Sequence, residues 1–229
     1  GEGHAYTGRK SVPECPMRVS FRPTTAAMRA AMLAAVMALS ACVGGSDFRT
    51  FYPEPVAAGV STNWRVVDVQ VTAPRSLRVS EARTYLPDAD IVWREDPASG
   101  NRYEQVEKIV ADAAREGTAG LHGARPVVLQ VTLSRFHAMT FEAESLSFAA
   151  GVHDIEFTAQ VVDARSGAVL TGPTFIEASL PARTGGAMAQ LRAQGDSQKK
   201  QISRHLRSVF AGWLGIGPDP RQTFTRTGG

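Results

Sequence analysis

The sequence predicts an α+β fold, an antiparallel sheet of four to five strands with two main helices packed on one face. Two periodicities support this prediction. Several segments alternate apolar and polar residues, as half-buried strands do, and two segments repeat apolar residues every 3.6 positions, as amphipathic helices do. The turn at 163–167, which ends in glycine, favours antiparallel pairing of the strands on either side of it.

The strands are expected at 64–72, 125–137, 152–163 and 174–180. In the first, apolar and polar side chains alternate from Trp64 until Pro74 ends the pattern, and 77–79 is a candidate short strand. The third points Ile155 and Phe157 to one face and Glu156 to the other. These alternations predict one buried sheet face.

The two helices are expected at 102–118 and 196–214. Ser99 or Asn101 is a candidate cap for the first helix, and Asp196 for the second, which could also start earlier, near Gly186. Each carries an apolar stripe. The stripes consist of Tyr103, Val106, Ile109, Val110 and Ala113 in the first helix, and Ile202, Leu206, Val209, Phe210 and Trp213 in the second.

Charge and cysteine content exclude several classes of protein. The chain has 25 Lys+Arg and 22 Asp+Glu, but residues 1–41 hold five of the basic and two of the acidic ones, which leaves 20 of each after position 41. A neutral domain is not expected to bind nucleic acid. The cysteines are Cys15 and Cys42, so no disulfide is expected within the domain.

An apolar run from Ala30 follows three arginines and closes at Leu39-Ser40-Ala41-Cys42. A basic flank, a short apolar run and small residues are typical of a secretory signal. With its cysteine, the motif resembles the lipobox of bacterial lipoproteins. That resemblance implies cleavage before Cys42 and attachment of lipid, palmitate included, to its thiol. The alternative for 30–41 is a buried or amphipathic helix, but the run has no polar face.

The predicted organisation has four parts. Residues 1–41 are an upstream extension plus the cleaved signal peptide, with Met17 or Met28 as the true start. Residues 42–62 are a lipidated tether and extended arm, residues 63–220 a single α+β domain, and residues 221–229 a polar tail anchored by Phe224.

Catalytic and metal-binding patterns are not found in the sequence. It has no nucleophile elbow, phosphate loop, dinucleotide fingerprint or His-Glu-x-x-His motif. Acidic residues gather at 88–96, but the spacing fails the calcium-loop test because Trp93 stands where the turn glycine is needed. We therefore expect no metal, no cofactor and no enzymatic activity.

Three blocks carry a resemblance to a family. They are Asn63-Trp64-Arg65-Val66-Val67-Asp68-Val69, Ala89-Asp90-Ile91-Val92-Trp93-Arg94-Glu95-Asp96-Pro97 and Gly212-Trp213-Leu214-Gly215-Ile216-Gly217-Pro218-Asp219-Pro220-Arg221. The sequence resembles an uncharacterised family of alphaproteobacterial lipoproteins, a domain of unknown function, over nearly all of the chain after the lipobox. The resemblance implies export, lipidation and a single domain. The order of elements is also similar in plan to lipopolysaccharide-assembly and transport-auxiliary lipoproteins.

The expected function is that of a non-enzymatic lipoprotein, anchored in the cell envelope through Cys42 and facing the periplasm, as an accessory or binding subunit of a larger assembly. Val43 after the cysteine favours the outer over the inner membrane. A sheet edge, the loop at 85–97 or a flap at 138–150 would recognise the protein partner. The candidate contact residues are Trp93, Phe141, Phe148 and Trp213.

Two other functions stay open from the sequence. One is a periplasmic carrier or binding module for lipid or a small apolar ligand, with a pocket lined by Phe141, Leu146, Phe148 and Trp213. The other is a hydrolase. It requires two residues of a set to converge in a cleft with a nucleophile, the set being His137, Glu142, His153 and Asp154.

Overall fold

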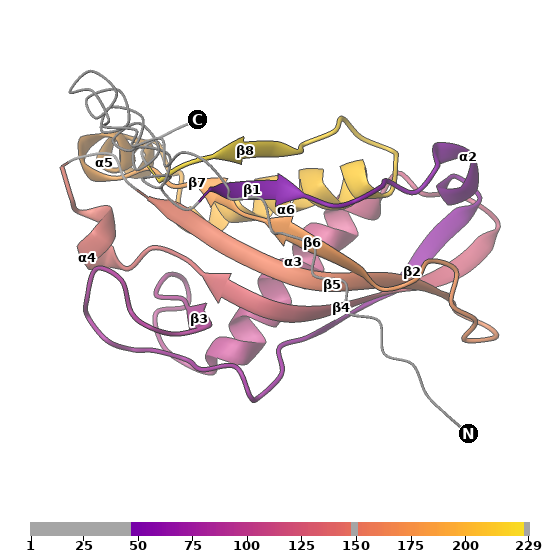
Figure 1. Ribbon diagram of the computed structural model, residues 1–229, viewed down its shortest axis with the longest axis horizontal. Coiled ribbons are helices and arrows are strands. Elements are labelled where there is room, and N and C mark those ends of the chain that lie inside the picture. The colour runs from indigo at the N-terminus through magenta and orange to yellow at the C-terminus, as the bar shows by residue number, and fades with distance from the viewer. Residues whose placement is uncertain (1–46, 148–150, 227–229) are drawn as a thin grey trace, which may run out of the picture. The chain divides into compact units, whose positions relative to one another are not determined.

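The computed structural model describes residues 47–147 and 151–226, which form eight strands and five helices (Figure 1). The predictions for the signal, for Cys42 and for Phe148 lie outside these residues. The strands are β1 (Phe48–Phe51), β2 (Trp64–Thr72), β3 (Ile91–Val92), β4 (Arg125–His137), β5 (Val152–Asp163), β6 (Thr174–Ala178), β7 (Leu180–Pro181) and β8 (Gln222–Phe224). The helices are α2 (Ala58–Ser61), α3 (Arg102–Thr118), α4 (Phe141–Glu144), α5 (Gly185–Ala193) and α6 (Gln198–Trp213).

The α+β class is confirmed, but the predicted sheet of four to five strands is too small. The eight-stranded sheet has the order β2-β4-β5-β6-β1-β8, with β3 paired to β4 and β7 paired to β5. β1 and β8 come from the segments predicted to be an arm and a polar tail. They pair with each other, and Phe224 is buried there. Short strands of this kind carry too little alternation to be recognised locally.

The prediction of an antiparallel sheet is right for β4, β5 and β6 and wrong for β2. β4 pairs antiparallel with β5 from Val127 opposite Asp163 to His137 opposite Asp154. β2 instead pairs parallel with β4. The reason is α3, which lies between these two strands in the chain, since a helical crossover returns the chain to the end of the sheet where the first strand began.

The two long helices begin at polar caps. The side chain of Asn101 accepts hydrogen bonds from the backbone N–H groups of Tyr103 and Glu104, which confirms one of the two predicted caps of α3. α6 is capped by Ser197, whose hydroxyl accepts from Lys200, rather than by Asp196. The prediction of two main helices is also incomplete, because the described residues contain α2, α4 and α5 as well.

α3 and α6 lie side by side against the same face of the sheet (Figure 1). A Cβ on Gly117 of α3 would stand 2.6 Å from the backbone oxygen of Arg207 on α6, so this glycine permits the close approach of the two helices. Between helix and sheet, the rings of Phe157 and Phe210 stack 5.2 Å apart. Trp213 is 1% exposed in the same core. Large apolar side chains therefore fill the interface between helices and sheet.

Within residues 47–147 and 151–226, no helix has the length and apolar character that crossing a bilayer would require.

Candidate functional site

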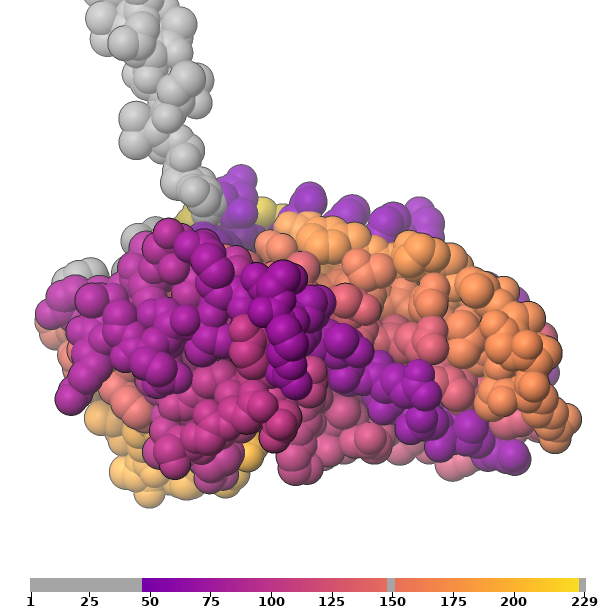
Figure 2. Space-filling model, turned by 90° about the horizontal axis from the view of Figure 1, so that it is seen from below, coloured from indigo at the N-terminus to yellow at the C-terminus, as the bar shows by residue number. Residues whose placement is uncertain are grey.

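The loop that joins β2 to α3 runs across the C-terminal end of β4 and forms one wall of the candidate site. β3 within it pairs parallel with β4, with Ile91 opposite Phe136. The backbone N–H of Ala138 donates to the carbonyl of Val92 at 3.0 Å, and Nε2 of His137 lies 3.0 Å from the carbonyl oxygen of Pro87. The loop is therefore a fixed part of the domain. Figure 2 shows residues 75–100, in purple to magenta, packed against neighbouring segments.

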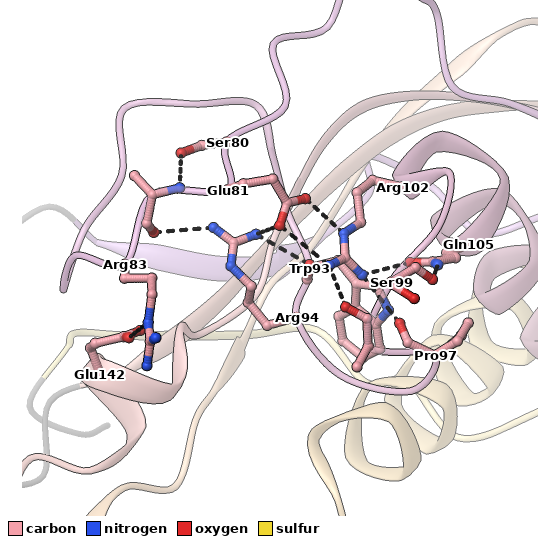
Figure 3. Close-up of polar contacts among 12 residues, drawn as sticks. Ser80, Glu81, Arg83, Trp93, Arg94, Pro97, Ser99, Arg102, Gln105 and Glu142 are labelled. Atoms are coloured by element: carbon pink, nitrogen blue, oxygen red, sulfur yellow. Dashed lines mark hydrogen bonds and ion pairs between the residues drawn. The ribbon is translucent and has the colours of Figure 1, made fainter.

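Glu81 ties the loop to the start of α3, and Figure 3 shows it between Arg94 and Arg102. The Arg102 guanidinium, almost fully buried, donates to Glu81 at 2.8 Å and to the carbonyl oxygens of Pro97 and Ala98 at 3.2 and 2.8 Å. The hydrogen bond that Arg102 donates to Glu81 lowers the pKa of the Glu81 carboxyl. Arg102 is buried and donates to oxygens on separate parts of the loop. These charge-assisted hydrogen bonds hold the loop in one conformation.

α4 forms the opposite wall and is held to the same loop. Arg83 donates to Glu142 at 3.0 Å, a contact drawn in Figure 3, and the Thr140 hydroxyl donates to the carbonyl of Thr84 at 2.8 Å. The Arg83 guanidinium lowers the pKa of the Glu142 carboxyl. Both contacts place α4 beside the two exposed residues that follow Thr84.

Arg192 of α5 fixes α4 from the other side. Its guanidinium donates to both oxygens of the buried Glu144 at 2.6 and 2.7 Å and to the buried Glu95 at 2.6 Å. Gln198 also donates to Glu144. The paired carboxylates raise the pKa of Arg192. A bidentate arginine fixes both the distance and the angle to its carboxylate. Arg192 therefore holds α4, α5 and the loop in a fixed position relative to one another.

A cavity of about 200 Å³ lies between these walls. Its apolar lining residues are Leu86, Ala138, Met139, Ala143, Leu146 and Val152. Its polar lining residues are Arg135, His137, Asp154 and Arg226. Tyr85 also lines it, and Tyr85 and Leu86 are 63% and 61% exposed. The site combines apolar walls with a charged pair and an exposed aromatic ring, which is a common composition for a binding site.

The polar side of the cavity is arranged as a structural contact rather than as a catalytic pair. Arg135 donates to Asp154 at 2.6 Å, and the hydroxyl of Ser179 donates to the same carboxylate at 2.8 Å. Burial lowers the pKa of His137, which disfavours its charged form. The Ser179 hydroxyl therefore donates to the side chain of Asp154 and not to an imidazole.

Two of the four residues named for the hydrolase alternative, His137 and Asp154, do line this cavity. His153 points to the other face of β5, because neighbours in a strand alternate, and Glu142 pairs with Arg83. The hydrolase alternative requires a nucleophile beside His137. Among the described residues, no contact places one there. No group of His, Cys, Asp and Glu in this part of the chain could hold a metal ion.

The predicted contact residues are dispersed. Phe141 is 47% exposed on α4, with the Arg192 guanidinium 5.8 Å from its ring. Trp93 and Trp213 are 0% and 1% exposed in the core, and burial does not favour the partner contacts predicted for them. The sequence prediction included the loop at 85–97 but did not single out Tyr85 and Leu86 within it. The sequence signal for these two residues is their position directly before Pro87, because a residue before proline is disfavoured in a helix and two large apolar residues there indicate an exposed turn.

The fold and the site define a class of protein: an α+β domain whose helices cover one face of a mixed sheet, and whose long loop encloses a small surface cavity. Residues 64–229 match the model of a family of unknown function (DUF6778), and the chain belongs to that family. The comparison with curated proteins found no match.

Several solved structures resemble the fold at low identity. PelC from Paraburkholderia phytofirmans, a dodecamer, is 16% identical with a TM-score of 0.32, over 76% of this chain and 98% of its own. XCC0632 from Xanthomonas campestris is 11% identical with a TM-score of 0.39, over 72% and 91%. A candidate lipoprotein from Caulobacter crescentus CB15 is 14% identical with a TM-score of 0.29, over 70% and 96%. At these identities the likeness concerns the fold alone.

Proposed function

We propose that this chain is a non-enzymatic lipoprotein of the cell envelope that binds a protein partner through the cavity beneath the loop. The Cys42 lipid would hold it at the membrane, with the domain facing the periplasm and with the outer membrane favoured by Val43. The domain would then act as an accessory subunit of a larger envelope assembly.

The observation that carries the proposal is the gathering of exposed apolar side chains around one cavity. Tyr85 and Leu86 stand on its wall, and Phe141 stands on α4, which the Arg83–Glu142 pair holds to the same loop. Large apolar residues grouped on a surface mark interaction sites more often than those scattered singly. Aromatic anchors beside a preformed pocket are the usual centre of a protein interface.

The rigidity of the walls supports binding of a partner in a set geometry. Arg192 and Arg102 each donate to several oxygens on different segments, so the cavity exists before any partner arrives. A preformed site avoids the entropy cost of ordering loops on binding.

The carrier alternative has one observation in its favour and two against it. The cavity wall includes Leu146, which the alternative named, together with Met139 and Val152. A volume of about 200 Å³, however, is below the range of pockets that enclose drug-sized ligands. Trp213, also named, is buried in the helix–sheet core instead. An apolar side chain of a partner fits the cavity better than a whole lipid.

The test is site-directed cross-linking in membranes. A photoreactive amino acid replaces Tyr85 in the lipidated chain, and irradiation is expected to give one discrete protein adduct. Adding Leu86→Ser should abolish the adduct, because the apolar anchor is lost. The matched control is Val169→Ser, since Val169 is 59% exposed on a different segment and should leave the adduct unchanged.

Further arms of the experiment separate the anchor from the binding site. Cys42→Ser should move the protein out of the membrane fraction, whereas Leu86→Ser should not. Equal adducts from Leu86→Ser and Val169→Ser would refute the proposed site. Lipid rather than protein on the probe would favour the carrier alternative.

A further inference from the structure

The face of the central strands turned away from α3 and α6 carries an ordered array of uncharged polar side chains. Three glutamines stand in register across three strands, with Gln70 opposite Gln130 and Gln130 opposite Gln160. Two residues from each glutamine, toward the same end of the sheet, stands a threonine, with Thr72 opposite Thr132 and Thr132 opposite Thr158. Side chains two apart share a face, so the six form one surface of amides and hydroxyls.

The glutamine amides are oriented by a directed chain of hydrogen bonds. Gln160 donates to Gln130 at 2.7 Å, Gln130 donates to Gln70 at 3.2 Å, and Gln70 donates to Asp68 at 3.0 Å. Each donation uses one N–H of an amide that has two, and each accepting oxygen keeps a second lone pair. The row is therefore preorganised and still has free donors and acceptors.

The threonine hydroxyls have their full capacity available. Among the described residues, those of Thr72, Thr132 and Thr158 make no hydrogen bond to protein. A groove of about 360 Å³ runs over them, and none of the residues that line it is ionisable. At the end of the threonine row, Thr158 stands opposite Phe175, which is 47% exposed. The groove thus combines hydroxyls and amides, and the ring of Phe175 belongs to the neighbouring strand beside it.

The chemistry of the groove selects among ligands. Nucleic acid requires lysines and arginines at its phosphates, and the only charge in the glutamine row, Asp68, would repel a polyanion. Protein interfaces are enriched in aromatic residues, methionine and arginine, and none of these lines the groove. A neutral glycan fits, because its hydroxyls pair with amides and threonines while its C–H face packs on a ring such as that of Phe175.

The spacing of the array also suits an extended glycan. Adjacent strands lie about 4.8 Å apart, so equivalent hydroxyls repeat at that interval across the sheet. This repeat is comparable to one sugar residue of an extended chain. We propose that the Gln70–Gln130–Gln160 and Thr72–Thr132–Thr158 array, with Phe175, is a binding face for a neutral polysaccharide chain. This site is independent of the cavity beneath the loop and of the lipid anchor.

The experiment uses the full chain in a zwitterionic detergent that has no sugar head group. Calorimetric titration with cellohexaose, laminarihexaose and N-acetylchitohexaose is expected to show binding of at least one, with no binding of hyaluronan oligosaccharides. Thr132→Val keeps the shape and removes one hydroxyl, which should weaken binding about fivefold, the equivalent of one hydrogen bond. Phe175→Ala should weaken it by a similar factor.

The matched control is Thr223→Val, the same change at an exposed position of β8 outside the array, which should leave affinity unchanged. Circular dichroism of each variant verifies the fold. Three results would overturn the proposal: no binding of any neutral hexasaccharide, equal binding of the acidic glycan, or equal affinity in the Thr132 and Thr223 variants. A change of oligomeric state in Thr132→Val without glycan binding would assign the face to self-association instead.

Discussion

Two buried histidines are expected to lower the free energy of unfolding of this domain at mildly acidic pH. Burial, with smaller contributions from His205 and His137, lowers the pKa of His153 to about 3. Burial also lowers the pKa of His205 to about 4, and its Nε2 lies 3.1 Å from the hydroxyl of Thr50. Nδ1 of His153 has no hydrogen-bond partner among the described residues. Both rings are neutral in the folded protein above pH 5.

Proton linkage determines whether the free energy of unfolding rises or falls with pH. The unfolded chain binds a proton on each of these histidines below about pH 6.5, whereas the folded chain does not, so the free energy of unfolding falls as pH falls. From pH 7.5 to pH 5, each histidine is expected to remove about 2 kcal/mol of stability, or about 4 kcal/mol together. The carboxyl of Asp219, with a pKa lowered to about 2 by Arg221, weakens the fold only at lower pH.

The assay is urea unfolding at pH 7.5 and pH 5, followed by the fluorescence of the three buried tryptophans. His205→Gln and His153→Leu should each reduce the difference in stability between the two pH values by about 2 kcal/mol, whatever their absolute stability. The exposed His122 supplies the control variant, His122→Gln. If His153→Leu and His205→Gln keep the full difference found in the wild-type protein, the two histidines are not its cause.

Three further changes test the packing. Gly123→Ala should destabilise the domain strongly, since its Cβ would meet the backbone carbon of Asn63 at 2.0 Å. The control is Gly120→Ala, whose Cβ meets nothing within 4 Å, and the two midpoints of thermal unfolding are compared. Arg192→Met leaves two buried carboxylates unpaired and should cost about 2–3 kcal/mol in urea unfolding, less than a fully buried pair because Arg192 is a third exposed. Phe157→Ala should cost about 3–5 kcal/mol by the same measurement, because it empties the stacked core. A loss below 1 kcal/mol in either variant would contradict the contacts assigned here.

The long elements could be predicted because each repeats one pattern over many residues. The bounds expected for 64–72, 102–118, 125–137 and 152–163 are those of β2, α3, β4 and β5. Asn101 capped its helix as its residue type suggested. In these segments local periodicity and tertiary burial agree, so the sequence signal is strong.

The candidate site was harder to predict because its residues come together through long-range contacts. The segments at 85–97 and 138–150 were each named as surfaces for recognition, but nothing in their sequence shows that Thr140 bonds to Thr84 or that Arg192 reaches both Glu95 and Glu144. Trp93, which the sequence predicts as a contact residue, lies in the core against Phe136. Large aromatic residues serve both cores and interfaces, and only burial separates the two roles.

The sequence by itself determined the class of the fold, its long helices and strands, the neutrality of the chain after position 41 and the motif that ends at Cys42. These properties are local, since each is a pattern of neighbouring residues. Only the tertiary structure decided that β2 runs parallel to β4, that β1 and β8 complete the sheet, and that the glutamines and threonines of three strands form one array. Strand partners are chosen by burial and hydrogen bonding between distant segments, which a local pattern does not encode.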